Sequence, residues 1–269
     1  MSQEDICADG NLGIIEGSSK DKVVIQEYKQ FGGYGADVVY VFTKLFTLHN
    51  GGFFCDIGAN IGLVSIPIFQ IENVYGLTFE PDPTNYAYLL KNLSRHKVET
   101  KNYNIALGSH QGKTTLTLNE ENPGDHRISV ENDNNKIEIR IDKLNNFLYL
   151  VNKAPLAAKI DTQGSEIEII KGGGKFISKC TLITMEFWPF GLKRMNSDLD
   201  IMLNFLSNNF NYARHTMEFW HQQPLVEIEI VLKKMEEIYH KNNSEFYDFI
   251  FSKNKDCSPV FSTKLQYFS

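Results

Sequence analysis

Two acidic residues stand where buried strands end and could bind one ligand together. Asp56 is the last but one residue of the apolar run "GFFCDI", and Glu80 ends the run "VYGLTFE" one helical segment later. Gly58, Asn60 and Gly62 follow the first acid in the stretch D-I-G-A-N-I-G, which leads into the next helix. Glycine removes the Cβ atoms that would keep a ligand away from the main chain. In open α/β sheets ligands bind outside the carboxyl ends of the strands, so we expect both acids at one site.

The residue types at this site restrict the chemistry of the ligand. A pyrophosphate would be repelled by the carboxylate of Asp56, and the dinucleotide fingerprint G-x-G-x-x-G is absent, which argues against a nicotinamide-dependent oxidoreductase. Glu80 can accept hydrogen bonds from both hydroxyls of a ribose. S-adenosylmethionine combines a nucleoside with a cationic amino-acid end and no phosphate, so it is the expected cofactor. An ordinary strand-to-helix turn is the alternative for D-I-G-A-N-I-G, and the presence of Glu80 at this spacing makes that alternative less favoured.

If such a cofactor donates its methyl group to a hydroxyl, a general base or a metal must assist the loss of the hydroxyl proton. Asp161 ends the run "LAAKID" and is the first candidate, although it could instead cap the helix that follows. Glu186 is the last but one residue of "LITMEF" and could frame the acceptor together with Asp161. Glu166 lies in a first helical turn, where an acid is favoured by the helix dipole whatever the function. Two carboxylates without a matching histidine spacing are weak evidence for a metal, so none is predicted.

A glycine-led loop supplies the third catalytic candidate. His126 and Arg127 lie in "NPGDHRIS", where an insertion would cover the site. Histidine can take up a proton near neutral pH, and arginine can bind a carboxylate or phosphate of the acceptor. The alternative is a solvated loop pair. Trp188 follows the strand that ends at Glu186 and could stack on a sugar ring or pack at the rim.

Apolar runs alternate with helical patterns over most of the chain. Nearly continuous apolar strands separated by helices are typical of a parallel sheet covered on both faces, so we expect an α/β doubly wound, mostly parallel sheet. A helix is expected from Asp37, with that residue as N-cap and Gly51 and Gly52 as its end. Pro67 lies in the helix after Gly62, so that helix should be short or kinked.

The pattern divides the chain into three parts. Residues 1–36 form an N-terminal lead-in with one or two strands, 37–253 form the main domain, and 254–269 form a C-terminal tail. Within the domain, 113–141 alternates apolar with polar residues and reads as a β insertion at the sheet edge or over its mouth. The segment "EFYDFIFSK" near the end is typical of a closing strand.

Composition limits the partners. The formal net charge is −6 and the pI is about 5.7, so no nucleic-acid partner is expected. The four cysteines are far apart without a CxxC pair, and no apolar run approaches the length of a membrane span. The acidic N-terminus lacks the apolar segment of a signal peptide. A cytoplasmic protein without a membrane span is therefore expected, while the oligomeric state stays open.

Four segments in series resemble the FkbM family of S-adenosylmethionine-dependent methyltransferases: "FCDIGANIGLVSI", "GLTFEPDPTNYAYLLKNL", "AAKIDTQGSEIEIIKG" and "ITMEFWP". The resemblance implies a class I methyltransferase (Rossmann-like) fold with a seven-stranded sheet whose last strand is antiparallel. It also implies methyl transfer to a hydroxyl of a sugar, a glycan or a related small natural product.

Carried over by position, the resemblance also assigns residues to the cofactor. Its methionine end would contact Asp56, Gly58, Asn60 and Gly62; its ribose would contact Glu80, with Pro81 and Asp82 following; and its adenine would meet Ile105 and Ala106. Many members have Glu where this chain has Gln163, so a charged role at that position is in doubt, and Pro67 has no match in the family.

A second reading remains open. The chain could be a binding module that keeps the cofactor pocket but acts by association, with the β insertion as its interface. Asp56 and Glu80 fit both readings, whereas a base such as Asp161 or His126 is needed only by an enzyme. Methylation of protein or nucleic acid is also not excluded, and the sequence does not identify the acceptor.

Overall fold

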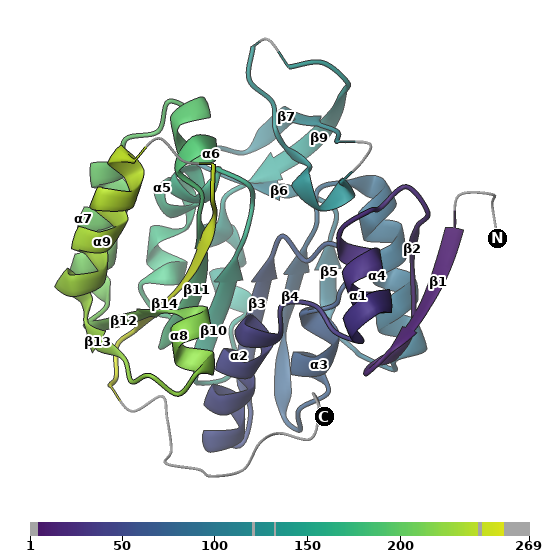
Figure 1. The fold of residues 1–269 in the computed structure, drawn as a ribbon, viewed down its shortest axis with the longest axis horizontal. Coiled ribbons are helices and arrows are strands. Elements are labelled where there is room, and N and C mark those ends of the chain that lie inside the picture. Colours follow the sequence, from purple (N-terminus) through teal and green to yellow (C-terminus); the bar gives the residue numbers. More distant parts are fainter. Residues whose placement is uncertain (1–4, 120–121, 132, 242–243, 256–269) are drawn as a thin grey trace.

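The computed structural model describes residues 5–119, 122–131, 133–241 and 244–255. Its centre is an eight-stranded sheet in the order β13-β12-β14-β11-β10-β3-β4-β5 (Figure 1). The strands are β3 (Gly52–Ile57), β4 (Val74–Phe79), β5 (Lys101–Tyr103), β10 (Leu156–Ile160), β11 (Leu182–Phe187), β12 (Tyr212–His215), β13 (Val226–Glu227) and β14 (Tyr247–Ser252).

The pairing confirms the predicted doubly wound, mostly parallel sheet. Strands β5, β4, β3, β10 and β11 pair in parallel, and β14 pairs antiparallel with both β11 and β12. The closing strand expected from "EFYDFIFSK" is therefore β14. The sheet has one strand more than the seven expected, because the two-residue β13 adds to its edge.

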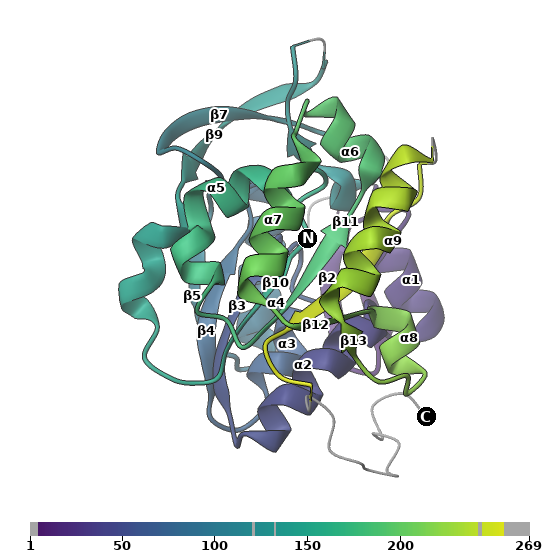
Figure 2. The same ribbon diagram turned by 90° about the vertical axis from the view of Figure 1, so that its left-hand side faces the viewer.

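Helices cover both faces of this sheet. On one face lie α5 (Glu166–Ile177), α7 (Leu199–Asn209), α9 (Ile228–His240) and the 3-10 helix η2 (Leu144–Leu150), and Figure 2 shows α5, α7 and α9 side by side. On the other face lie α2 (Ala36–Leu48), α3 (Ser65–Phe69) and α8 (Thr216–Trp220). Successive strand residues serve opposite faces, since Phe53 and Cys55 join the first core and Phe54 the second. All six residues of β3 are buried.

Two local predictions about helices have different outcomes. Asp37 does not cap α2, because the helix starts one residue earlier and Gly35 occupies the N-cap in a left-handed conformation. The carboxylate of Asp37 instead accepts a hydrogen bond from the Thr216 hydroxyl. The short helix expected around Pro67 is confirmed, since α3 has only five residues.

The lead-in forms a hairpin and a helix. Strands β1 (Asp5–Gly10) and β2 (Gly13–Ser18) pair antiparallel, and α1 (Val24–Phe31), which the sequence pattern did not predict, follows them. These elements share a hydrophobic core with α4 (Pro83–Arg95) and with residues that follow β3. The lead-in thereby lies beside the carboxyl end of the main sheet.

A second sheet of four strands lies above the first in Figure 1, in the order β6-β9-β7-β8. Its strands are β6 (Ala106–Leu107), β7 (Gly112–Thr117), β8 (Arg127–Ile128) and β9 (Lys136–Asp142), and a 3-10 helix η1 (Pro123–Asp125) precedes β8. The run 101–107 divides between the two sheets, because β5 ends at Tyr103 and β6 joins the small sheet. In the described parts of the chain, no helix is long and apolar enough to span a membrane.

Candidate active site

A cavity of about 370 Å³ lies at the carboxyl ends of β3, β4, β10 and β11. Its size is in the range of small-molecule sites. Its walls come from the lead-in, the turn after β3, the end of β4, and parts of β6, β7, η1 and β8. The ends of β10 and β11, the start of β14 and the residues just before it complete them. Of the predicted site residues, those that line it are Gly58, Asn60, Glu80, Pro81, Ile105, Ala106, His126, Asp161 and Glu186. Asp56, Gly62 and Asp82 are not among its lining residues.

Asp56 lies beneath the cavity floor. It is completely buried, and its Oδ2 accepts a hydrogen bond from the Ser65 hydroxyl at 2.5 Å. Its Oδ1 lies 3.4 Å from the Lys159 ammonium. Burial raises the pKa of Asp56, and the positive charge of Lys159 opposes that rise. The carboxylate therefore holds the turn from below and is not placed to touch a ligand directly.

The two glycines of the turn permit close packing of the main chain. Gly58 has φ +80°, and a Cβ atom there would lie 1.9 Å from the carbonyl oxygen of Asp161. Gly62 has φ +97°, and its Cβ atom would lie 2.9 Å from Leu89. Both positions need glycine to fit the turn against β10 and α4, in addition to any role toward a ligand.

Glu80 joins the ends of β3 and β4. Its side chain is buried, with 5% of the residue exposed, and its two oxygens accept the main-chain N–H groups of Asn60 at 2.8 Å and of Asp82 at 2.9 Å. Burial raises the pKa of Glu80 to about 7, although these hydrogen bonds lower it. Asp82 caps α4 by accepting the N–H of Asn85 at 2.7 Å. Glu80 is thus fixed with its carboxylate at the cavity wall.

Lys159 and Asp161 form the far side of the cavity. Lys159 donates a hydrogen bond to the Gly58 carbonyl at 2.8 Å and lies 3.2 Å from the Asp161 carboxylate. Burial alone would lower the pKa of Lys159, but the charges of Asp161 and Asp56 raise it above its ordinary value. The side chain of Asp161 is 32% exposed. Its capping alternative is not seen, because Glu166 accepts the N–H groups of Thr162 and Gly164 instead.

Glu186 lies next to Asp161 and is almost completely buried, with 4% of the residue exposed. Its Oε1 accepts a hydrogen bond from Gln163 Nε2 at 3.0 Å, while its Oε2 has no hydrogen-bond partner. Asp248 stands opposite Glu186 in the β11–β14 register. Burial, and then the charges of Asp161, Glu166 and Asp248, raise the pKa of Glu186 well above its ordinary value. Burial likewise raises the pKa of Asp248 to about 7.

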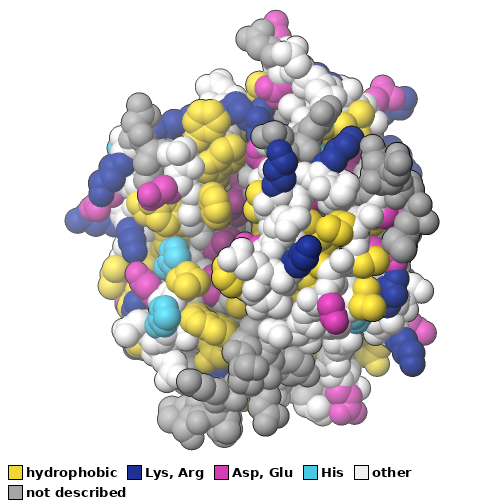
Figure 3. Space-filling view, turned by 45° about the vertical axis from the view of Figure 1, so that its right-hand side comes forward, with side chains coloured by type: hydrophobic (Ala, Val, Ile, Leu, Met, Phe, Trp, Pro, Cys, Tyr) yellow, Lys and Arg dark blue, Asp and Glu magenta, His cyan; other side chains and the backbone are white. Residues whose placement is uncertain are grey.

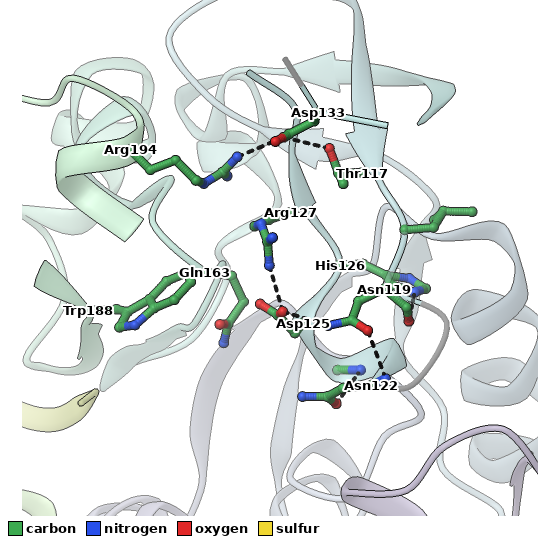
Figure 4. Close-up of polar contacts among 12 residues, drawn as sticks. Thr117, Asn119, Asn122, Asp125, His126, Arg127, Asp133, Gln163, Trp188 and Arg194 are labelled. Carbon is green, nitrogen blue, oxygen red and sulfur yellow. Dashed lines mark hydrogen bonds and ion pairs between the residues drawn. The ribbon is translucent and has the colours of Figure 1, made fainter. Parts of the chain in front are cut away.

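The loop from Asn122 to Arg127 forms one wall (Figure 4). Asn85 on α4 donates to the Pro123 carbonyl at 2.9 Å and fastens this loop. His126 lies between two partners, with Nδ1 3.5 Å from the Asp82 carboxylate and Nε2 3.2 Å from the Asn119 carbonyl. Arg127 donates to Asp125 at 2.6 Å, and its buried Nε has no hydrogen-bond partner.

Several cavity residues were not predicted from the sequence. Val24 and Tyr34 come from the lead-in, Lys159 from β10 and Asp248 from β14. Lys159 could have been predicted, because a lysine within the apolar run "LAAKI" must find buried partners for its charge. The lead-in residues could not have been predicted from a sequence pattern, since their position depends on how the hairpin packs. Within the described residues, no cluster of three or more His, Cys, Asp or Glu side chains is arranged to hold a metal ion.

The segment that builds this cavity matches a known family. The family model described as "Methyltransferase FkbM domain" matches residues 56–213. The chain belongs to the FkbM methyltransferase family. The FkbM match begins at Asp56 and ends in β12, so it includes Glu80, Asp161 and Glu186, whereas Tyr34 precedes it and Asp248 follows it. No curated protein matches the chain.

Solved structures similar to this FkbM chain include the following three. M. jannaschii TYW2 in complex with AdoMet has a TM-score of 0.46 and 9% identity, covering 94% of this chain and 86% of that one. Magnesium protoporphyrin IX methyltransferase from Synechocystis PCC 6803 with bound SAH has a TM-score of 0.44 and 13% identity, covering 87% and 88%. An rRNA methylase from Streptococcus thermophilus has a TM-score of 0.42 and 10% identity, covering 80% and 94%. These similarities are weak and carry no conclusion about the activity of this chain.

Proposed function

We propose that the chain is a methyltransferase whose cavity binds S-adenosylmethionine and that it methylates a hydroxyl of a small molecule or glycan. The observation that carries the proposal is the placement of Glu80 beside the Gly58–Asn60 turn, at the edge where neighbouring parallel strands end. Membership in the FkbM methyltransferase family supports it.

The residues present fit this cofactor. Each oxygen of Glu80 accepts one main-chain N–H and keeps lone pairs that can accept the ribose hydroxyls. Asn60 Oδ1 is buried without a hydrogen-bond partner and can accept from the ammonium of the methionine end. Ile105, Ala106 and Leu107 give an apolar wall suited to the adenine ring. The bound cofactor would supply an electrophilic methyl group on its sulfonium.

Asp161 is the proposed base. Its side chain is 32% exposed, whereas Glu166 and Glu186 are buried, and Lys159 and Gln163 contact its carboxylate. Burial and the neighbouring acids raise the pKa of Glu186, which favours its protonated form, so it would donate a hydrogen bond rather than take up a proton. His126 is held between Asp82 and Asn119, and we propose that it mainly positions the loop.

The surroundings of the cavity favour a small acceptor. Trp188 and Phe246 line it near the acids and offer aromatic faces to a sugar ring. On the face seen in Figure 3, Lys and Arg side chains are dispersed among hydrophobic and acidic ones. Nucleic-acid binding usually relies on clustered basic side chains, so this face offers no support for such an acceptor.

The proposal can be tested with cofactor that carries a radiolabelled methyl group. The purified protein is incubated with it and with fractionated extract of the source cells, and Asp161→Asn serves as the comparison. We expect label in a low-mass or glycan fraction with the parent protein and far less with the variant. Absence of label, or label confined to nucleic acid, would contradict the proposed acceptor class.

A further inference from the structure

The side chain of Gln163 lies between two acids at the cavity wall. Its Nε2 is 3.2 Å from Asp161 Oδ1 and 3.0 Å from Glu186 Oε1. A side-chain amide nitrogen carries two N–H groups, so Gln163 can donate one to each carboxyl group. Gln163 itself lines the cavity and adopts a left-handed backbone with φ +57°. Such a conformation is unfavourable for glutamine, and the two hydrogen bonds offset part of that cost.

The two acids are surrounded by other ionisable groups. These are Lys159 on β10, Asp56 on β3, Glu166 on α5, Asp248 on β14, Asp37 on α2 and Tyr34 before α2. Lys159 supplies the positive charge in this set, and it already contacts Asp56, Asp161 and the Gly58 carbonyl. Glu186 lines the cavity, and its Oε2 is buried without a hydrogen-bond partner in the described part of the chain. A second ionised carboxylate beside Asp161 would therefore be costly.

We infer that Gln163 is a positioning residue whose amide joins the carboxyl group of the proposed base Asp161 to that of Glu186 and holds both in place. This inference rests on the proposed function, because it assigns the roles of the acids in that reaction. A neutral donor suits the position, since it satisfies both carboxyl groups and adds no negative charge. A glutamate there would bring acceptor oxygens against two acceptors and would need a further proton.

The contact between Gln163 and Glu186 can be tested without cofactor or acceptor, because it changes the pH at which Glu186 titrates. The carboxyl carbons of glutamate are labelled with ¹³C, and their titration is followed by NMR in the cofactor-free protein. The signal of Glu186 is the one that is missing in Glu186→Gln. In Gln163→Met the acid loses a hydrogen bond that favours its charged form, so its titration midpoint should rise by about one pH unit. In Gln163→Glu one additional glutamate signal with a raised midpoint should appear.

Matched variants separate this role from a merely structural one. Gln222 also has a left-handed backbone, with φ +64°, but it is exposed. Gln222→Met should leave the Glu186 midpoint unchanged. If Gln163→Met does not fold, Gln163→Asn replaces it, because asparagine tolerates this backbone and its shorter amide cannot reach both acids.

An unchanged Glu186 midpoint in a folded Gln163 variant would overturn the inference. The proposed function is judged separately, by calorimetric binding of S-adenosylmethionine to the parent protein. Cofactor binding with an unchanged midpoint would leave the methyltransferase intact and remove the role of Gln163. A shifted midpoint without cofactor binding would keep the contact between Gln163 and Glu186 and remove the proposed methyltransferase function.

Discussion

The ammonium of Lys159 lies 3.2 Å from the carboxylate of Asp161, and the same ammonium donates a hydrogen bond to the Gly58 carbonyl at 2.8 Å. One buried cation thereby fixes both the turn after β3 and the acid at the end of β10. The proposed cofactor turn and the proposed base depend on it together. Asp56, completely buried below, relies on the same charge.

Replacing this cation should destabilise the protein. Lys159→Met keeps the length of the side chain but leaves Asp56 buried without its charged partner, and we expect a loss of about 3–5 kcal/mol in the free energy of unfolding. Urea denaturation at pH 7 measures it. Lys175→Met, at an exposed position on α5, is the matched control and should change stability by less than about 0.5 kcal/mol. Equal stability of the two variants would show that the buried ion pair is unimportant.

Stability should fall as the pH rises through the weakly acidic range. Glu80, Glu166 and Asp248 have pKa values of about 7 in the folded chain, chiefly because of burial, against ordinary values near 4. Between about pH 4.5 and 7 the folded state therefore binds more protons than the unfolded state, and its stability decreases with pH.

Urea denaturation at pH 5 and pH 7.5 measures this effect. We expect a decrease of at least about 2 kcal/mol, and a smaller decrease in Asp248→Asn, which lacks one of the groups. The acids with lowered pKa values, Asp133, Glu168 and Glu218, act at lower pH and do not cancel it. A free energy of unfolding that is constant or rises between these pH values would contradict the assigned protonation states.

The sequence predicted those parts of the site that lie at the ends of strands. Glu80, Asp161 and Glu186 each end an apolar run, and parallel strands bring their carboxyl ends to one edge, so their proximity follows from local pattern and topology. The same reasoning placed Asp56 at the ligand, whereas the structure buries it under the turn. Whether an acid at a strand end faces the cavity or the sheet depends on side-chain direction, which spacing does not specify.

Other parts of the site depend on packing between distant segments. Tyr34 reaches the cavity because the β1–β2 hairpin and α1 pack against α4, and no short-range pattern encodes that contact. His126 was predicted in a covering loop, but its contact with Asp82 comes from folding that loop onto the start of α4. The division of the run 101–107 between two sheets is also a tertiary effect.

Two variants should separate the candidate bases. Asp161→Asn should keep cofactor binding near the parent level and lower the rate of methyl transfer by on the order of 10²–10⁴, the usual contribution of a general base. His126→Ala should act mainly by loosening the loop, which raises the KM more than it lowers kcat. Rates are measured at saturating cofactor with the acceptor found in the labelling experiment. A folded Asp161→Asn that works at the parent rate would exclude Asp161 as the base.

Calorimetric titration of the parent protein and of Glu80→Gln with S-adenosylmethionine and S-adenosylhomocysteine tests the central claim most directly. At pH 8, above the Glu80 pKa of about 7, we expect both ligands to bind the parent, NAD to bind far more weakly, and Glu80→Gln to bind about 10-fold or more weakly, because the ribose hydroxyls lose a charged acceptor worth about 1.5–3 kcal/mol. Glu72→Gln, at an exposed position, should bind like the parent. Absence of binding by the folded parent, or parent-like affinity in folded Glu80→Gln, would contradict the assignment of this cavity to the cofactor.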